Sequence, residues 1–180
     1  AVLPIGADHI TSDVAIGLRT SIDVAEQVKI RYGTARPLDI QKKEEFDLQE
    51  LGAPESELVS RRFVADVIEA RVQELFERVD RELSKVGRSG MLPAGVVLTG
   101  GGARLRGMLE AAKDALRLPA TIGTPLGVSS AVERIMDPAM STAIGLVLWG
   151  HHVRSASDRS VWKRIAEKAK ALEQVGSWMG

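Results

Sequence analysis

The chain has 180 residues, of which 44% are hydrophobic and 27% are charged, as in ordinary globular proteins. Lysine and arginine together number 24, as do aspartate and glutamate, so the formal net charge is zero. We therefore expect no nucleic-acid partner, because such partners require a basic field. The absence of cysteine excludes disulfides, thiol catalysis and cysteine metal sites.

The first half of the chain is predicted to be mostly helical. A short strand at Val2–Ile5 leads to a helix that begins near Thr11. The next helix opens with a capping box and is expected to end in a left-handed glycine; it covers Thr20–Gly33. A strand is predicted at Glu45–Leu48, and a long helix with one apolar stripe over Glu55–Val86.

The second half alternates strands and helices, which is typical of an α/β fold. The predicted elements are a strand at Gly95–Thr99, a helix at Ala103–Leu118, a strand at Ala120–Ile122, a helix around Ser130–Met136 and a helix from Pro138 through Trp149. A polar linker is expected over residues 151–160, followed by an amphipathic helix over Val161–Met179.

A glycine-rich turn, Thr99–Arg104, connects a predicted strand to the following helix. Glycines let the backbone approach a ligand closely, and a helix N-terminus offers free N–H groups. The turn is not a P-loop, because Met108 and Leu109 stand where lysine and a hydroxyl residue are required. It is not a dinucleotide-binding turn, because Leu105 replaces the last glycine of that motif. A purely structural turn remains the alternative.

The string VVLTGGGARL (Val96–Leu105) resembles the adenosine motif of the actin superfamily. TSIDVAEQVKIRYG (Thr20–Gly33) is similar to the superfamily helix that contacts the nucleoside, and MSTAIGL (Met140–Leu146) to its second connecting helix. Together with GADHITSDVAIGL (Gly6–Leu18), these strings occur in the order and spacing of the FtsA family over about residues 1–150. One departure is Arg106, where FtsA relatives commonly have proline or another non-basic residue.

This resemblance implies the second lobe of an actin-like ATPase, an α/β fold of the ribonuclease H-like class with an inserted α+β subdomain. The base subdomain would comprise residues 1–7 and 94–150, the inserted subdomain 8–93, the linker 151–160 and a membrane-targeting amphipathic helix 161–180. The family's phosphate-gripping hairpins and magnesium-positioning acids have no counterpart here. We therefore expect a piece of a longer protein, with no catalytic residue in it and at most slow ATP hydrolysis.

By the same resemblance the ligand is ATP, with Mg²⁺ held by the missing lobe. Gly100 and Gly101 would pass beneath the nucleoside, followed by Gly102 in the same turn. Arg104 would stack its guanidinium plane on adenine. The alternative for this arginine is a solvated side chain in the first turn of a helix.

The nucleoside-contacting helix would supply the ribose contacts. Glu26 would accept hydrogen bonds from the ribose hydroxyls, and Lys29, three residues later on the same face, would flank the base. Gly33 lies one turn further along that face. An ordinary ion pair on the surface is the alternative for Glu26 and Lys29.

A partner surface is also implied on the long helix. The segment Ile68–Asp80 matches the FtsA helix that receives the C-terminal tail of FtsZ, the tubulin-like ring protein. Carried over by position, Arg71 and Glu74 would contact that tail, and Arg78 could share their face. Because Glu74 and Arg78 are four residues apart, a solvated helix face explains them equally well.

The C-terminal segment Val161–Met179 resembles the amphipathic helix with which FtsA proteins lie on the membrane. Its expected membrane contacts are Trp162, Ile165, Leu172 and Trp178. Packing against the body or a partner protein is the alternative, because alanines make the apolar face thin. We expect a peripheral protein on the cytoplasmic side of the cell membrane at the division site. Self-association into actin-like filaments would strengthen this weak attachment.

The overall expectation is an ATP-binding adaptor that tethers the FtsZ ring to the membrane during septum formation. A PilM-like pilus-assembly adaptor shares a similar glycine turn, but it has no matching C-terminal membrane helix. An actin-fold kinase would need a substrate-binding carboxylate and phosphate loops that this sequence does not show.

Overall fold

The computed structural model describes residues 1–128 and 133–153. The chain divides into two compact units, Ala1–Met140 and Ser141–Gly180. In the second unit, residues 141–153 are helical. No helix among the described residues has both the length and the apolarity that are needed to cross a bilayer.

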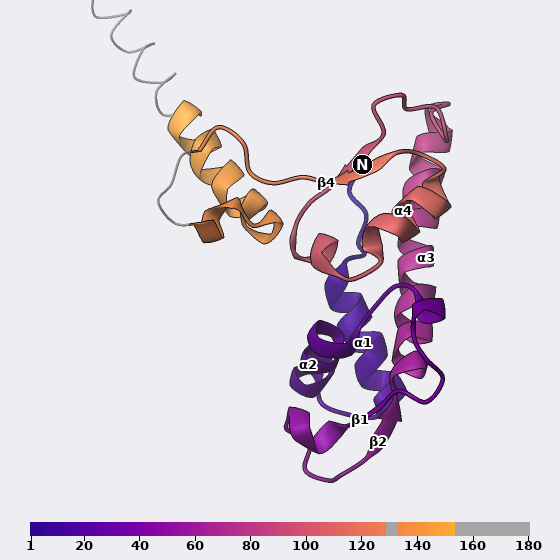
Figure 1. The fold of residues 1–180 in the computed structure, drawn as a ribbon. Coiled ribbons are helices and arrows are strands. Elements are labelled where there is room, and N and C mark those ends of the chain that lie inside the picture. The colour runs from indigo at the N-terminus through magenta and orange to yellow at the C-terminus, as the bar shows by residue number, and fades with distance from the viewer. Residues whose placement is uncertain (129–132, 154–180) are drawn as a thin grey trace, which may run out of the picture. The chain divides into compact units, whose positions relative to one another are not determined.

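Three helices form the centre of the first unit: α1 (Ala7–Leu18), α2 (Ile22–Tyr32) and α3 (Arg61–Lys85). They pack against one another, and α3 runs between the β1–β2 end of the unit and the β3–β4 end (Figure 1). The core that they share includes the fully buried side chains of Ile10, Val14, Val28, Val64, Ile68 and Val72. Each such side chain contributes about 1.5 to 3 kcal/mol when it is buried.

A small antiparallel hairpin closes one end of this unit. Strand β1 (Glu45–Asp47) pairs with β2 (Leu58–Ser60), and the 3₁₀ helices η1 (Pro37–Asp39) and η2 (Leu48–Leu51) flank β1 in sequence. Inside the hairpin, the Asp47 carboxylate accepts hydrogen bonds from the Gln49 and Glu57 amides and from the Ser56 hydroxyl. The first residues of the long helix predicted over Glu55–Val86 were therefore wrong, because this carboxylate organises a turn and a second strand there. The helix itself begins at Arg61.

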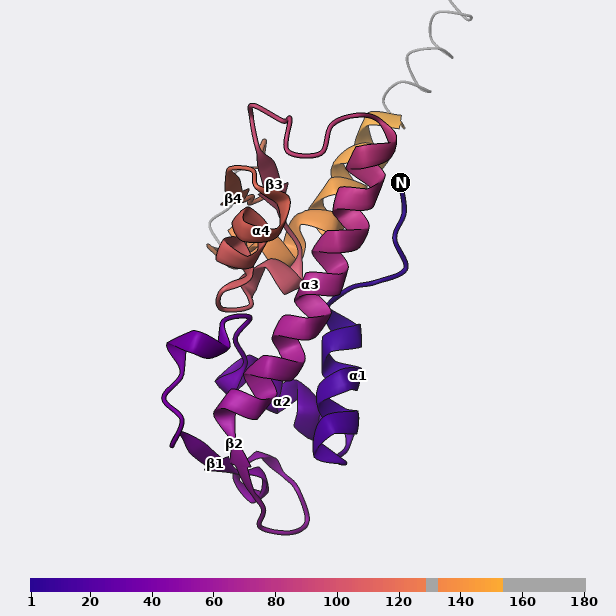
Figure 2. The ribbon, with the colours of Figure 1, turned by 90° about the vertical axis from the view of Figure 1, so that its right-hand side faces the viewer.

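A parallel pair of strands lies at the other end of the unit. Strands β3 (Val96–Leu98) and β4 (Ala120–Ile122), both predicted, are connected through helix α4 (Met108–Leu116), which packs on α3 (Figure 2). The single long helix predicted over Ala103–Leu118 is divided. The 3₁₀ helix η3 (Gly101–Arg104) comes first, and Gly107 with φ of 75° separates it from α4.

Further differences from the prediction lie at the N-terminus and at the ends of α1 and α2. Residues 1–6 form no strand, and α1 begins at Ala7 rather than near Thr11, since the Gly6 amide donates to the His9 ring and closes the first turn. Ser21, rather than Thr20, caps α2 by accepting from the Val24 amide. Gly33 is extended, with φ of −66°, and not left-handed.

The segment after β4 is described in part. The predicted helix at Ser130–Met136 partly lies outside the described residues, and its last four residues form the 3₁₀ helix η4 (Glu133–Met136). The 3₁₀ helix η5 (Pro138–Met140) precedes the helical residues 141–153. That helix extends three residues into the segment predicted as a linker.

Candidate functional site

The glycine turn has a backbone that only glycine adopts easily. Gly100 has φ of 87° and ψ of 173°, and its amide donates to the Pro138 carbonyl at 3.0 Å. A Cβ built on Gly102 would lie 3.3 Å from the Cβ of Ala7, so the small residue lets the turn approach the start of α1. The turn therefore brings bare backbone next to the first residues of α1.

A polar cluster on α1 and α2 faces this turn. The Thr11 hydroxyl donates to Glu26 Oε2 at 2.5 Å and accepts from Lys29 Nζ at 2.7 Å. Lys29 Nζ also lies 2.6 Å from Glu26 Oε2 and donates to the Ala7 carbonyl at 3.4 Å. The predicted pair of Glu26 and Lys29 is thus a three-residue cluster with a buried threonine at its centre.

Sequence reasoning missed Thr11, although a signal for it exists. Thr11 begins the apolar stripe that continues through Val14, Ala15 and Leu18, and all four residues are buried. A hydroxyl in such a stripe needs a hydrogen-bonding partner inside the protein. That requirement points to the polar residues of the neighbouring helix.

The cluster holds Glu26 in its charged form. Partial burial raises the pKa of this carboxyl, but the hydrogen bonds from Lys29 and Thr11, with the charge of Lys29, outweigh it. The net pKa of Glu26 lies below its ordinary value. Glu26 is consequently an ionised acceptor at neutral pH, which is the state that binds hydroxyl groups best.

A cavity of about 590 Å³ lies between the polar cluster and the glycine turn. The predicted ligand-contacting residues that line it are Glu26, Lys29, Gly33, Gly101, Gly102 and Arg104. Gly100, which was also predicted to contact the nucleoside, is not among the residues that line the cavity. Arg104 Nη1 forms an ion pair with Asp137 Oδ2 at 3.0 Å, although 64% of its side chain is exposed. The structure therefore brings together residues from α1, α2 and the turn that are far apart in sequence.

Gly33 ends α2 for a steric reason. Its amide donates to the carbonyls of Val28 and Lys29, and a Cβ there would lie 2.3 Å from the Lys29 oxygen. The same Cβ would lie 2.9 Å from Ile68 Cδ1 on α3. Close packing, rather than an unusual φ, requires glycine at this position.

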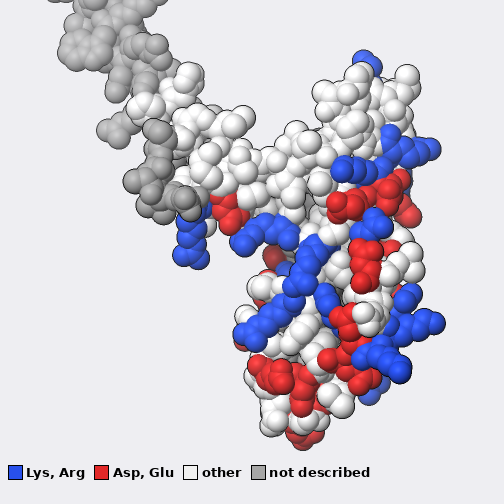
Figure 3. All heavy atoms as spheres, in the orientation of Figure 1, with Lys and Arg blue, Asp and Glu red and all other residues white. Residues whose placement is uncertain are grey.

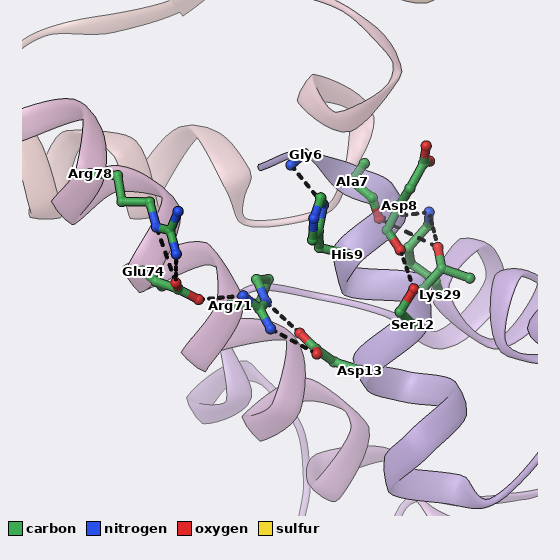
Figure 4. A network of polar contacts seen from close by, with 11 residues as sticks. Gly6, Ala7, Asp8, His9, Ser12, Asp13, Lys29, Arg71, Glu74 and Arg78 are labelled. Atoms are coloured by element: carbon green, nitrogen blue, oxygen red, sulfur yellow. Dashed lines mark hydrogen bonds and ion pairs between the residues drawn. The ribbon is translucent and has the colours of Figure 1, made fainter. Parts of the chain in front are cut away.

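The predicted partner residues form a chain of charges across α3 and α1 (Figure 4). Arg71 donates to both carboxylate oxygens of Asp13, at 2.5 and 2.8 Å, and also pairs with Glu74. Glu74 pairs in turn with Arg78 at 2.5 Å. The hydrogen bond from Arg78 is the main reason that the pKa of Glu74 is lowered, with the charge of Arg71 adding to it.

Asp13 is the member of this chain that sequence reasoning missed. A bidentate arginine–carboxylate contact fixes geometry as well as adding energy, so Arg71 and Asp13 connect α3 to α1.

Over the face in Figure 3, basic and acidic groups are interspersed and no large area of one sign is visible. The predicted membrane residues Trp162, Ile165, Leu172 and Trp178 lie outside the described residues.

Comparisons with known proteins identify relatives over most of the length of the chain. A family model described as "Cell division protein FtsA" matches residues 1–145. The cell division protein FtsA of Pseudomonas aeruginosa is 33% identical over 184 residues, covering 99% of this chain and 44% of that protein. FtsA of Neisseria meningitidis is 38% identical over 148 residues, covering 82% of this chain and 36% of that protein.

Solved structures of MreB5 from Spiroplasma citri share the fold. The crystal structure bound to AMPPNP has a TM-score of 0.56 and 15% identity, covering 86% of this chain and 47% of that one. The structure bound to ADP has a TM-score of 0.55 and 17% identity, covering 84% and 47%. The predicted actin-like fold is confirmed, and this chain spans less than half the length of these relatives. Because the family model matches most of its residues, this chain belongs to the FtsA family of cell-division proteins.

Proposed function

We propose that this chain supplies the nucleoside-binding and partner-binding part of an actin-like division protein that tethers the FtsZ ring to the membrane. The observation that carries the proposal is the cavity in which the polar cluster faces the glycine turn. Its volume of about 590 Å³ is in the range of small-molecule sites. The FtsA family match supports this function over a pilus adaptor or a kinase.

The residues of the cavity suit adenosine. The ionised Glu26 carboxylate can accept hydrogen bonds from two ribose hydroxyls, while Lys29 lies beside it at the cavity wall. Gly101 and Gly102 offer close approach of the backbone. Arg104 would exchange its exposed ion pair with Asp137 for stacking on adenine, an exchange that costs little because surface ion pairs are weak. Phosphates and Mg²⁺ would be held by another part of a longer protein.

This site can be tested by measuring the affinity for adenosine after substitutions in two ion pairs, one in the cavity and one outside it. Isothermal titration or NMR titration of the 180-residue chain with adenosine should show weak binding that Glu26→Gln and Lys29→Met reduce about tenfold or more. The control is the pair Glu82 and Lys85, which has the same i,i+3 spacing at 2.6 Å but lies on α3 away from the cavity. Equal effects of Glu82→Gln and Glu26→Gln would contradict the proposed site.

The partner surface is proposed to be the Arg71, Glu74 and Arg78 face of α3, and its occupant the FtsZ tail. Because Arg71 also holds α1 through Asp13, loss of Arg71 could act through packing alone. Asp13→Asn separates the two effects, because it weakens the contact with α1 and leaves the guanidinium available. Fluorescence anisotropy with an FtsZ tail peptide should show weaker binding for Arg71→Ala and Glu74→Ala, but not for Asp13→Asn or the control Arg81→Ala. Equal weakening by Arg71→Ala and Asp13→Asn would indicate a structural role only.

Membrane attachment is proposed for the segment after Ser160. Its sequence carries four basic and two acidic residues among Val161–Met179, with tryptophans at positions 162 and 178. The intact chain should sediment with anionic vesicles, and a chain truncated before Val161 should stay in the supernatant. If the truncated and intact chains pellet equally, this segment is not the tether.

A further inference from the structure

The two walls of the proposed nucleoside cavity come from separate segments of the chain. One wall is formed by α1 and α2, which carry Glu26 and Lys29, and the other by the turn from Gly101 to Arg106. The distance between the walls depends on the contacts that join the end of α2 to the end of the turn. Three hydrogen bonds across this junction involve the same residue, Arg106.

Residue 106 joins the two walls through both its backbone and its side chain. The Arg106 carbonyl accepts from the Ala35 amide at 2.8 Å and from the Thr34 hydroxyl at 3.2 Å. Thr34 and Arg106 also form a parallel bridge outside the named strands. The guanidinium Nη2 of Arg106 donates to the Arg31 carbonyl at 2.5 Å.

The side-chain contact has a clear physical basis at the end of α2. The last four carbonyls of a helix have no partner within the helix, and they carry the negative end of its dipole. Arg106 supplies a cationic donor to one of them, and Arg61 Nε supplies another to the Tyr32 carbonyl at 3.1 Å. The last turn of α2 is therefore held from the glycine-turn side by Arg106 and from α3 by Arg61.

We propose that Arg106 is a positioning residue of the nucleoside site. By binding the Arg31 carbonyl, it holds the last turn of α2, which includes Lys29, at a fixed distance from the glycine turn. This inference rests on the proposed binding of adenosine in the cavity. It assigns to Arg106 a role through the protein backbone rather than a contact with phosphate.

Comparing the affinities for adenosine and for ATP distinguishes a positioning role of Arg106 from a direct contact with phosphate. NMR titration of the 180-residue chain would measure the affinity of each ligand for the unchanged chain, Arg106→Met, Arg106→Lys and the control Arg81→Met. A positioning role predicts that Arg106→Met weakens both ligands to the same extent, about five- to tenfold. Arg106→Lys keeps a cationic donor and should recover most of the affinity for both.

Three results would overturn the inference. Weakening of ATP without weakening of adenosine would mean that Arg106 contacts phosphate directly. Unchanged affinity for both ligands in Arg106→Met, with binding intact in the unchanged chain, would remove the positioning role and leave the proposed function standing. No binding of adenosine by the unchanged chain would refute the proposed site and the inference with it. Because Arg106 is exposed, the variants should remain folded, and far-UV circular dichroism checks this.

Discussion

The Thr11 hydroxyl occupies the centre of the polar cluster and contacts both charged members. It donates to Glu26 and accepts from Lys29, so it fixes the orientation of the carboxylate that we expect to bind ribose. Thr11→Val keeps the shape of the side chain and removes all hydrogen bonds of the hydroxyl, including the contacts with Glu26 and Lys29. We expect a loss of about 1 to 2 kcal/mol in the free energy of unfolding and a weaker affinity for adenosine.

Thermal and chemical unfolding together with adenosine titration measure these effects. The control is Ser12→Ala, which removes the neighbouring exposed hydroxyl, whose partner is the Asp8 carbonyl. If Thr11→Val binds adenosine as tightly as Ser12→Ala does, Thr11 does not organise the site.

The lowered pKa of Glu26 predicts how the free energy of unfolding changes as the pH falls. Burial opposes ionisation, but the Lys29 and Thr11 hydrogen bonds dominate, so the folded-state pKa lies below the unfolded value. The resulting stabilisation is fully present above the unfolded value of about 4.3 and is lost as the pH falls through the folded-state pKa. Because the Glu26 side chain is 39% exposed, this contribution should be below about 1 kcal/mol.

Urea unfolding of the unchanged chain and of Glu26→Gln between pH 6 and pH 3 measures this contribution. The unchanged chain should lose more free energy of unfolding than the variant over that interval. Parallel curves for the two proteins would show that the folded state does not favour the charged carboxylate.

At the scale of elements, the end of α2 is defined by a steric requirement at Gly33. A Cβ added to Gly33 would lie only 2.3 Å from the Lys29 carbonyl oxygen. That oxygen belongs to the backbone of α2, so it cannot move without displacing the helix. Gly33→Ala should therefore lower the free energy of unfolding by about 2 to 3 kcal/mol. Gly6→Ala is the control, because Gly6 is extended and a Cβ there would meet nothing within 4 Å. Similar melting temperatures for the two variants would contradict this account of the helix end.

Elements with a strong periodic signal could be predicted from the sequence. The apolar stripe gave α3, and the apolar runs gave β3 and β4. The strand β2 could not be predicted, because it depends on the Asp47 carboxylate capturing the Ser56 hydroxyl and the Glu57 amide. The break before α4 depends on Gly107, where a Cβ would lie 2.8 Å from Arg36 Cγ of a distant segment.

The candidate site was predictable where the residues follow a known motif and not where the fold creates the contact. Glu26, Lys29, Gly101 and Gly102 belong to such motifs, and all four line one cavity. Asp13 and Arg106 become informative only when α3 and the end of α2 come close to them. Contacts between segments 58 or 75 residues apart leave no local pattern in the sequence.

At the scale of the whole molecule, the chain corresponds to 44% of the length of FtsA from Pseudomonas aeruginosa. A site that contacts only the nucleoside should bind weakly, because the charged phosphates find no dedicated grip in it. The proposed membrane and FtsZ attachments are likewise weak for a single chain, and linking many of them in the proposed filament would make the association durable. Weak affinity of the isolated chain is thus part of the proposal.

The most direct test of the central claim is the position of bound adenosine. Isotope-filtered NMR measures nuclear Overhauser contacts between unlabelled adenosine and the labelled 180-residue chain. The proposal predicts contacts from ribose protons to the side chains of Glu26 and Lys29, and from base protons to Gly101, Gly102 and Arg104. Contacts confined to residues outside the cavity, or no contacts at saturating adenosine, would contradict it.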